Sequence, residues 1–221
     1  MAHIWRNYGL SLALATLFLL SMVGQTLSGW RVYNDEQGQH AGPKVGIVTY
    51  LQTGHFGEAT FENWESEFLQ MAFYILLTAR LYQRGSSESK RPGVPEEVDR
   101  DPRASVAKPD APWPVRRGGW IPTWYEHSLS LTFAVLFVVS FTLHGVRGLT
   151  EHNAQQLAHG LSSDTLASYM TGSQFWFESF QNWQSEFLSV AAIVLLSIFL
   201  RQRGSPESKP VHMPHAHTGK E

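Results

Sequence analysis

Long apolar runs alternate with strongly polar stretches along this chain, a pattern typical of membrane proteins. Residues 8–27 form the first run, about twenty residues without a charge, which is the length that an α-helix needs to cross the hydrocarbon core of a bilayer. The second run, residues 68–81, has only about fourteen residues and spans a bilayer only as part of a longer helix. We predict that helix over residues 61–84, with Thr60 as its N-cap. Residues 129–143 begin a third span.

The pattern occurs twice. Residues 61–69 recur as residues 180–188 with seven identities among nine positions, at an offset of 119 residues. The same offset, without a gap, relates further identical residues, among them Trp5 and Trp124, Asn34 and Asn153, His40 and His159, and Tyr50 and Tyr169. It also relates residues 83–86 to residues 202–205. We therefore interpret the chain as a duplicated two-helix unit.

This duplication defines the expected domains. Residues 1–84 form the first two-span repeat, residues 85–119 a linker rich in proline and charge, residues 120–204 the second repeat, and residues 205–221 a disordered tail. Each repeat has an even number of spans, so both have the same orientation. The sequence predicts an all-α integral membrane protein with four transmembrane helices in two tandem, parallel repeats. Their pseudo-two-fold axis would run along the membrane normal.

The basic residues predict the orientation. Of the 17 Lys and Arg residues, 14 lie before the first span, in residues 80–117 or near the C-terminus, whereas Arg31, Lys44 and Arg147 lie in the other connections. We expect the linker and both termini in the cytoplasm and the lipid bilayer as the surrounding partner. The net charge of -2 gives no indication of nucleic acid binding, and the absence of cysteine excludes disulfides, zinc–thiolate sites and thiol catalysis.

Polar residues in the second helix of each repeat form a candidate pocket. They are Asn63, Trp64, Glu67, Asn182, Trp183 and Glu186. A carboxylate at the bilayer centre costs about 2.5–3.5 kcal/mol, so Glu67 and Glu186 should face protein or a wet cavity. The pseudo-two-fold axis would bring them together. They then either bind a proton or cation, or accept hydrogen bonds that fix the extracytoplasmic loops.

A second candidate is the pattern Asn-x-x-Gln-x-x-His, which consists of Asn34, Gln37 and His40 in one repeat and of Asn153, Gln156 and His159 in the other. Spacing by three places these residues roughly on one face of a helix. We interpret them as a hydrogen-bonded loop cap. The alternative is a transition-metal site formed by the two histidines with Glu67 and Glu186, and the sequence leaves a metal open.

The motifs at residues 62–69 and 202–210, with their copies, resemble an uncharacterised family of bacterial inner-membrane proteins classed only as a domain of unknown function. The resemblance implies a small four-span inner-membrane protein and brings no activity, cofactor or catalytic residue. We expect a non-enzymatic accessory or scaffold bundle with a structured extracytoplasmic cap and no cofactor. A homo-oligomer and a larger membrane complex both stay open. The alternatives are a small proton, cation or solute transporter or channel that uses Glu67 and Glu186, and a metal-dependent membrane enzyme.

Overall fold

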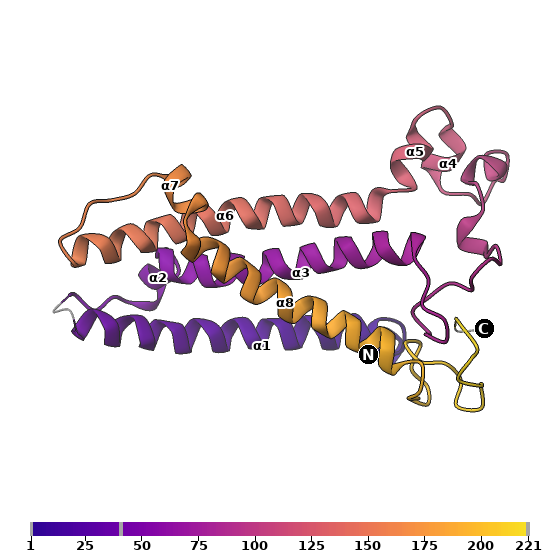
Figure 1. The fold of residues 1–221 in the computed structure, drawn as a ribbon, viewed down its shortest axis with the longest axis horizontal. Coiled ribbons are helices and arrows are strands. Elements are labelled where there is room, and N and C mark those ends of the chain that lie inside the picture. Colours follow the sequence, from indigo (N-terminus) through magenta and orange to yellow (C-terminus); the bar gives the residue numbers. More distant parts are fainter. Residues whose placement is uncertain (1, 40–41, 220–221) are drawn as a thin grey trace. The chain divides into compact units, whose positions relative to one another are not determined.

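The computed structural model describes residues 2–39 and 42–219, and within these ranges all regular secondary structure is helical. The all-α expectation is therefore confirmed. The long helices are α1 (Ala2–Gln39), α3 (Gly54–Arg80), α6 (Ser128–Ala158) and α8 (Ser173–Leu196) (Figure 1). The short ones are α2 (Ile47–Tyr50), α4 (Trp113–Arg117), α5 (Ile121–Tyr125) and α7 (Leu166–Thr171), with 3-10 turns η1 (Glu97–Asp99) and η2 (Pro102–Ser105).

Two helices of the described residues, α1 and α6, are long and apolar enough to cross a membrane. Many of their leucines and valines are exposed, as side chains in contact with lipid would be; Leu10 is 74% exposed and Val135 is 61% exposed. Helices α3 and α8 have 27 and 24 residues, but polar residues occupy much of their first halves. Their length alone does not make them spans.

The chain divides into two compact units whose borders cut α3, α6 and α8. Unit 1 comprises Met1–Phe61 and Thr142–Phe175, and unit 2 comprises Glu62–Phe141 and Trp176–Glu221. Unit 1 thus holds α1, α2, α7, the beginning of α3 and the end of α6. Unit 2 holds the rest of α3, the beginning of α6, most of α8, the linker with α4 and α5, and the C-terminal tail.

In unit 1 the beginning of α3 packs tightly against α6. Gly54 makes this approach possible, because a Cβ atom there would lie 2.5 Å from the backbone nitrogen of Glu151 and 2.9 Å from the carbonyl oxygen of Arg147. The Arg147 guanidinium donates to the carbonyl oxygens of Gln52 at 2.9 Å and Thr53 at 3.1 Å. These contacts fix the chain just before α3 on the surface of α6.

Helix α3 begins earlier than the sequence predicts. The Thr53 hydroxyl accepts a hydrogen bond from the backbone N–H of Phe56 at 3.3 Å, which is the N-cap pattern for a helix that begins at Gly54. Thr60 lies inside the helix, where its hydroxyl donates to the carbonyl oxygen of Phe56 at 2.8 Å and accepts from Gln25 at 3.1 Å. The predicted start after Thr60 is wrong because a threonine two turns earlier caps the helix.

In unit 2 the segments that follow α3 and α8 form the same turn. Gly85 and Gly204 adopt φ angles of 88° and 84°, which favour glycine. The backbone N–H of Gln83 donates to the Ser89 hydroxyl at 2.8 Å. The equivalent bond from Gln202 to Ser208 measures 2.9 Å. Two segments with the same residue pattern therefore close in the same way.

The tail folds back onto the first of these turns. Lys209 is 1% exposed, and its ammonium donates to the carbonyl oxygens of Gly85 at 2.5 Å, His217 at 2.8 Å and His215 at 3.0 Å. Burial lowers the pKa of Lys209. The Thr218 hydroxyl accepts a hydrogen bond from the backbone N–H of Gly85 at 2.8 Å. The composition of the tail predicts disorder, and this stays a prediction. In a disordered tail the contacts of Lys209 and Thr218 would be lost.

Candidate functional site

A row of hydrogen bonds joins α3 to α8 within unit 2. Glu65 is 0% exposed, and its Oε1 atom accepts hydrogen bonds from the Ser179 hydroxyl at 3.0 Å and from the Trp183 indole N–H at 3.3 Å. A buried carboxylate needs such donors, because desolvation without partners strongly disfavours the charged form. The Glu65 side chain therefore acts as an acceptor that two residues of α8 share.

The row continues on either side of this carboxylate. The Asn182 amide donates to the Glu62 carboxylate at 2.5 Å. The amide of Gln70, a buried residue, donates to the Ser189 hydroxyl at 3.2 Å and to the carbonyl oxygen of Glu186 at 3.3 Å. We call these side chains the polar ladder; they are Glu62, Glu65 and Gln70 of α3 with Ser179, Asn182, Trp183 and Ser189 of α8. The ladder gives the two helices a polar seam.

The six residues of the pocket predicted from the sequence lie only partly in this seam. Asn182 and Trp183 belong to the polar ladder and are half-buried, like Trp64 and Glu186, whereas Asn63 and Glu67 are exposed. Glu67 and Glu186 lie close enough to interact electrostatically. The structure thus brings these two carboxylates near one another and assigns the buried position on α3 to Glu65.

The difference between the two motif copies distinguishes Glu62 and Glu65. The nine-residue motifs 61–69 and 180–188 are identical except at two positions, which hold Glu62 and Glu65 in the first copy and Gln181 and Gln184 in the second. These two glutamates are the carboxylates that accept the hydrogen bonds between α3 and α8. Where two copies of a motif pack together, the positions at which they differ are candidates for donor–acceptor pairing.

Two asparagines of the predicted loop cap close loops in unit 1. The Asn34 side chain is buried; its amide donates to the carbonyl oxygen of Val45 at 3.1 Å, and its Oδ1 atom accepts from the backbone N–H of Val45 at 2.7 Å. The Asn153 amide makes the same two bonds to the backbone of Asp164, again at 3.1 and 2.7 Å. Each asparagine side chain thus satisfies both the backbone N–H and the backbone carbonyl group of one loop residue, as a neighbouring strand would.

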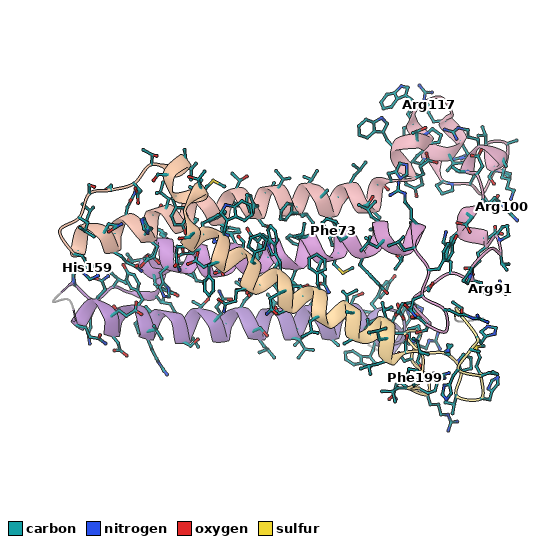
Figure 2. The ribbon with its side chains drawn as sticks, in the orientation of Figure 1. Phe73, Arg91, Arg100, Arg117, His159 and Phe199 are labelled. Carbon is teal, nitrogen blue, oxygen red and sulfur yellow. The ribbon has the colours of Figure 1, made fainter. Side chains whose placement is uncertain are left out.

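The remaining residues of the predicted cap take other positions. The carbonyl oxygen of Gln37 accepts from the backbone N–H of Gly42 at 2.7 Å, and the Gln156 amide lies 3.3 Å from Nε2 of His152. His159 lies exposed just beyond the end of α6 (Figure 2). His40 lies outside the described residues. The described residues of the cap therefore act mainly through Asn34 and Asn153.

Two tyrosines pack against glycines on the long helices of unit 1. A Cβ atom at Gly29 of α1 would clash with the Tyr50 hydroxyl, and one at Gly148 of α6 would clash with the Tyr169 hydroxyl. Tyr50 shares a hydrogen bond of 3.1 Å with Nδ1 of His55, and burial raises the pKa of Tyr50. The missing Cβ atoms make room for each hydroxyl at the helix surface.

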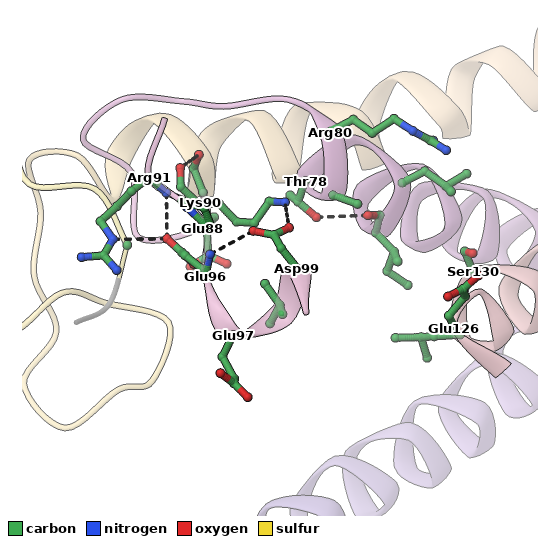
Figure 3. Close-up of a pocket in the computed structure, with 18 of the residues that line it drawn as sticks. Thr78, Arg80, Glu88, Lys90, Arg91, Glu96, Glu97, Asp99, Glu126 and Ser130 are labelled. Atoms are coloured by element: carbon green, nitrogen blue, oxygen red, sulfur yellow. Dashed lines mark hydrogen bonds and ion pairs between the residues drawn. The ribbon is translucent and has the colours of Figure 1, made fainter. Parts of the chain in front are cut away.

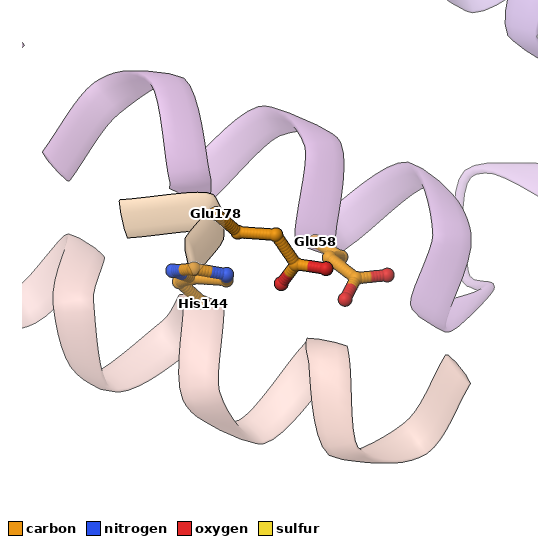
Figure 4. Close-up of side chains that lie close together, drawn as sticks. All are labelled: Glu58, His144 and Glu178. Atoms are coloured by element: carbon orange, nitrogen blue, oxygen red, sulfur yellow. The ribbon is translucent and has the colours of Figure 1, made fainter. Parts of the chain in front are cut away.

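The second tyrosine belongs to a polar cluster. The Tyr169 hydroxyl donates to Oε1 of Glu58 at 3.1 Å, and a ligand atom of Glu58 lies within 4.8 Å of one of His144, which is 0% exposed (Figure 4). Glu178, also drawn there, belongs to unit 2. Carboxylate and imidazole are common metal ligands, but protein metal sites usually use three or four. Within the described residues of unit 1, Glu58 and His144 supply two.

A wide pocket of about 1140 Å³ lies in unit 2 beside the linker (Figure 3). Charges of both signs line it and pair with one another. Lys90 contacts Asp99 at 2.5 Å, and Arg91 contacts Glu96 at 3.3 Å. The hydrogen bond from Lys90 lowers the pKa of Asp99. The lining also carries Arg80, Glu88, Glu97 and Glu126, so its acidic side chains outnumber its basic ones.

No curated protein and no solved structure matches the chain. One family does, over residues 1–220, and its description is "Domain of unknown function (DUF6766)". The expected resemblance to a family classed as a domain of unknown function is therefore confirmed. The chain belongs to this family of proteins with a domain of unknown function.

Proposed function

We propose that the protein is a non-enzymatic membrane scaffold with four spans, in which α3 and α8 cross the bilayer as well as α1 and α6. The polar ladder is the observation that carries this proposal. In a membrane, hydrogen bonds between helices hold spans together where lipid gives no hydrophobic driving force, at about 0.6–2 kcal/mol each. The polar ladder supplies such hydrogen bonds between α3 and α8. It also provides the buried Glu65 carboxylate with donors from the neighbouring helix.

The repeated contacts support two parallel repeats. Asn34 and Asn153 close their loops with bonds of equal length, and Tyr50 and Tyr169 each pack against a glycine. Every pair is related by the offset of 119 residues. Two copies of one hairpin in the same orientation, with a pseudo-two-fold axis along the membrane normal, account for this agreement.

The proposed location and orientation in the membrane rest on the distribution of the basic residues. With the linker, the tail and both termini in the cytoplasm, 14 of the 17 basic residues lie on the cytoplasmic side of a bacterial inner membrane. The loops closed by Asn34 and Asn153 then form a structured extracytoplasmic cap. A structured cap and a row of hydrogen bonds between α3 and α8 suit an accessory role in a larger membrane complex or a homo-oligomer.

Paired variants of α3 test the scaffold. Glu65→Ala removes the shared acceptor of Ser179 and Trp183. We expect it to lower the free energy of unfolding in mild detergent by about 1–3 kcal/mol, because the buried Ser179 hydroxyl and the half-buried Trp183 indole lose their acceptor. Glu67→Ala is the matched control two residues away, where the side chain is exposed. We expect that control to unfold like the unsubstituted protein. Equal melting of the two variants would remove the structural role assigned to the ladder.

A transporter or channel for protons, cations or a small solute is the second candidate. The electrostatic interaction between Glu67 and Glu186 supports it, because a nearby negative charge strengthens the attraction of a carboxylate for a proton or a cation. The test is flux in proteoliposomes of the double variant Glu67→Gln and Glu186→Gln. The scaffold predicts no proton or cation flux for either protein above that of empty vesicles. Flux in the unsubstituted protein that the double variant abolishes would establish transport instead.

A further inference from the structure

A small helical lobe with an unusual surface is formed by the end of the linker and the first residues of the predicted second repeat. Helices α4 and α5 contact one another and bury Val115 and Pro122. The tryptophans of the lobe stay outside this small core: Trp113 is 62% exposed, Trp120 is 71% exposed and Trp124 is 62% exposed. We call residues 113–125 the tryptophan lobe.

Three exposed indoles in so short a segment require a partner that suits them. Tryptophan is large and apolar with one N–H donor, and its side chain is favoured where an apolar medium meets water. Single exposed apolar residues are normal on protein surfaces, but clustered ones mark an interaction site. The tryptophan lobe therefore presents a surface suited to the boundary between lipid and water.

The charge of the lobe specifies the partner further. Residues 113–125 include Arg116 and Arg117, both exposed, and no Asp or Glu. Arg117 lies at the outer edge of the lobe (Figure 2). The guanidinium of Arg103 donates a hydrogen bond to the Thr123 hydroxyl of the lobe at 3.0 Å and also pairs with the Asp101 carboxylate at 3.6 Å, so the free positive charge of this surface comes from Arg116 and Arg117. Arginine binds phosphate through paired N–H donors, so this surface is complementary to anionic phosphate groups.

The chain also places the lobe next to a membrane. Tyr125 ends α5, and α6 begins at Ser128. The two residues that separate them reach about 7 Å when fully extended. Among the described residues, α6 is one of two helices apolar enough to span a bilayer, so the lobe lies at the bilayer surface if α6 crosses it. This step rests on the proposed four-span arrangement.

We propose that the tryptophan lobe docks onto the bilayer that holds the protein and binds the headgroups of anionic phospholipids. The indoles of Trp113, Trp120 and Trp124 enter the interfacial region, and Arg116 and Arg117 contact lipid phosphates. The lobe thereby ties the connection between the two repeats to the cytoplasmic leaflet.

The absence of native cysteine allows a direct test with the full chain. An environment-sensitive fluorophore is attached to Trp120→Cys in nanodiscs of phosphatidylcholine alone or with an equal part of phosphatidylglycerol. The matched control is Val98→Cys, a position of the same linker that is 79% exposed. We expect blue-shifted emission at position 120 and quenching by headgroup nitroxide lipids, both stronger in the anionic nanodiscs, and neither effect at position 98.

The double variant Arg116→Gln and Arg117→Gln tests the charge. An arginine near an anionic surface favours docking by a factor of about five, so its loss at both positions should reduce the ratio of docked to free lobe about 25-fold in the anionic nanodiscs. Equal emission at positions 120 and 98 in both lipids would overturn the proposal. A blue shift that lipid nitroxides do not quench would also overturn it, because a second copy or another protein then covers the lobe.

A third labelled position separates this proposal from the four-span proposal. Val135 of α6 is 61% exposed, and a fluorophore on Val135→Cys should be quenched by nitroxides on the lipid acyl chains. Quenching at position 135 without quenching at position 120 would overturn the docking of the lobe alone. Absence of quenching at position 135 would contradict the span formed by α6, and with it the premise of both proposals.

Discussion

Asn34 and Asn153 each bind, through the same two side-chain atoms, the backbone of the residue eleven positions further along the chain. The two bonds measure 3.1 and 2.7 Å in both places. One asparagine follows the apolar part of α1, and the other follows that of α6. The loops that they close differ in sequence, since Val45 stands in one and Asp164 in the other. Backbone recognition by an asparagine therefore explains how different loops adopt the same closure.

Loss of either asparagine should open its loop. We expect Asn34→Ala to lower the free energy of unfolding by about 1–3 kcal/mol, because a buried side chain that satisfies backbone groups of Val45 is removed. Hydrogen exchange of residues 44–46 should accelerate at the same time. Asp35→Ala, one residue away and exposed, is the control. If the two variants exchange alike, Asn34 does not hold the loop.

The contact between Gly29 and Tyr50 predicts a rescue experiment. Gly29→Ala should destabilise the protein by about 1–3 kcal/mol, because the added methyl group overlaps the Tyr50 hydroxyl. Tyr50→Phe removes that hydroxyl, so the double variant should recover part of the loss. The control is Gly24→Ala on the same helix, where a Cβ atom would meet nothing within 4 Å. A Gly29→Ala protein as stable as the Gly24→Ala protein would show that the hydroxyl does not lie there.

Asp164 should give the cap a defined dependence on pH. Its hydrogen bonds from His152 and Ser168 lower the pKa of the Asp164 carboxyl. A depressed folded-state pKa means that the carboxylate stabilises the folded state fully above the ordinary aspartate value of about 3.9, and that this contribution disappears as pH falls through the folded-state pKa. Thermal unfolding in detergent should therefore show a small loss of stability below about pH 4 that Asp164→Asn lacks. An unchanged acid profile for that variant would contradict the assignment.

The two turns after α3 and α8 should differ in their tolerance of alanine. Both glycines have positive φ, so alanine is strained at each. At Gly85 a Cβ atom would also lie 3.0 Å from the carbonyl oxygen of His215, whereas at Gly204 it would meet nothing within 4 Å. Gly85→Ala should therefore lower the melting temperature more than Gly204→Ala and increase proteolysis of the tail. Equal effects would mean that the tail does not pack on the first turn.

Much of the helical architecture can be predicted from the sequence. The uncharged runs 8–27 and 129–143 lie within α1 and α6, because a long uncharged, mostly apolar run favours a helix. The start of α3 was not predicted correctly. Thr53 and Thr60 are both acceptable N-caps, and the choice depends on contacts of Gly54 and Arg147 that are distant in the sequence.

The candidate site, like the fold, can be predicted only in part from the sequence. Spacing by three predicts Asn34 and Asn153 as members of a loop cap, and in the structure each of them bonds to the backbone of one loop residue. Spacing did not identify Glu65, because a helical period gives the relative positions of side chains on a helix and not which face its neighbour covers. Only the position of α8, with Ser179 and Trp183, makes Glu65 the buried carboxylate and leaves Glu67 exposed.

The accessibility of single cysteines tests the central claim, the four spans, most directly. Lys44 and Ser163 lie exposed in the two loops of the proposed extracytoplasmic cap, and Val98 and Val211 lie exposed in the linker and tail. Our account predicts that a membrane-impermeant maleimide labels cysteines at positions 44 and 163 in intact cells. It should reach positions 98 and 211 only after the membrane is permeabilised. Labelling of position 98 together with position 44 in intact cells would contradict the account, because α3 would then not cross the membrane.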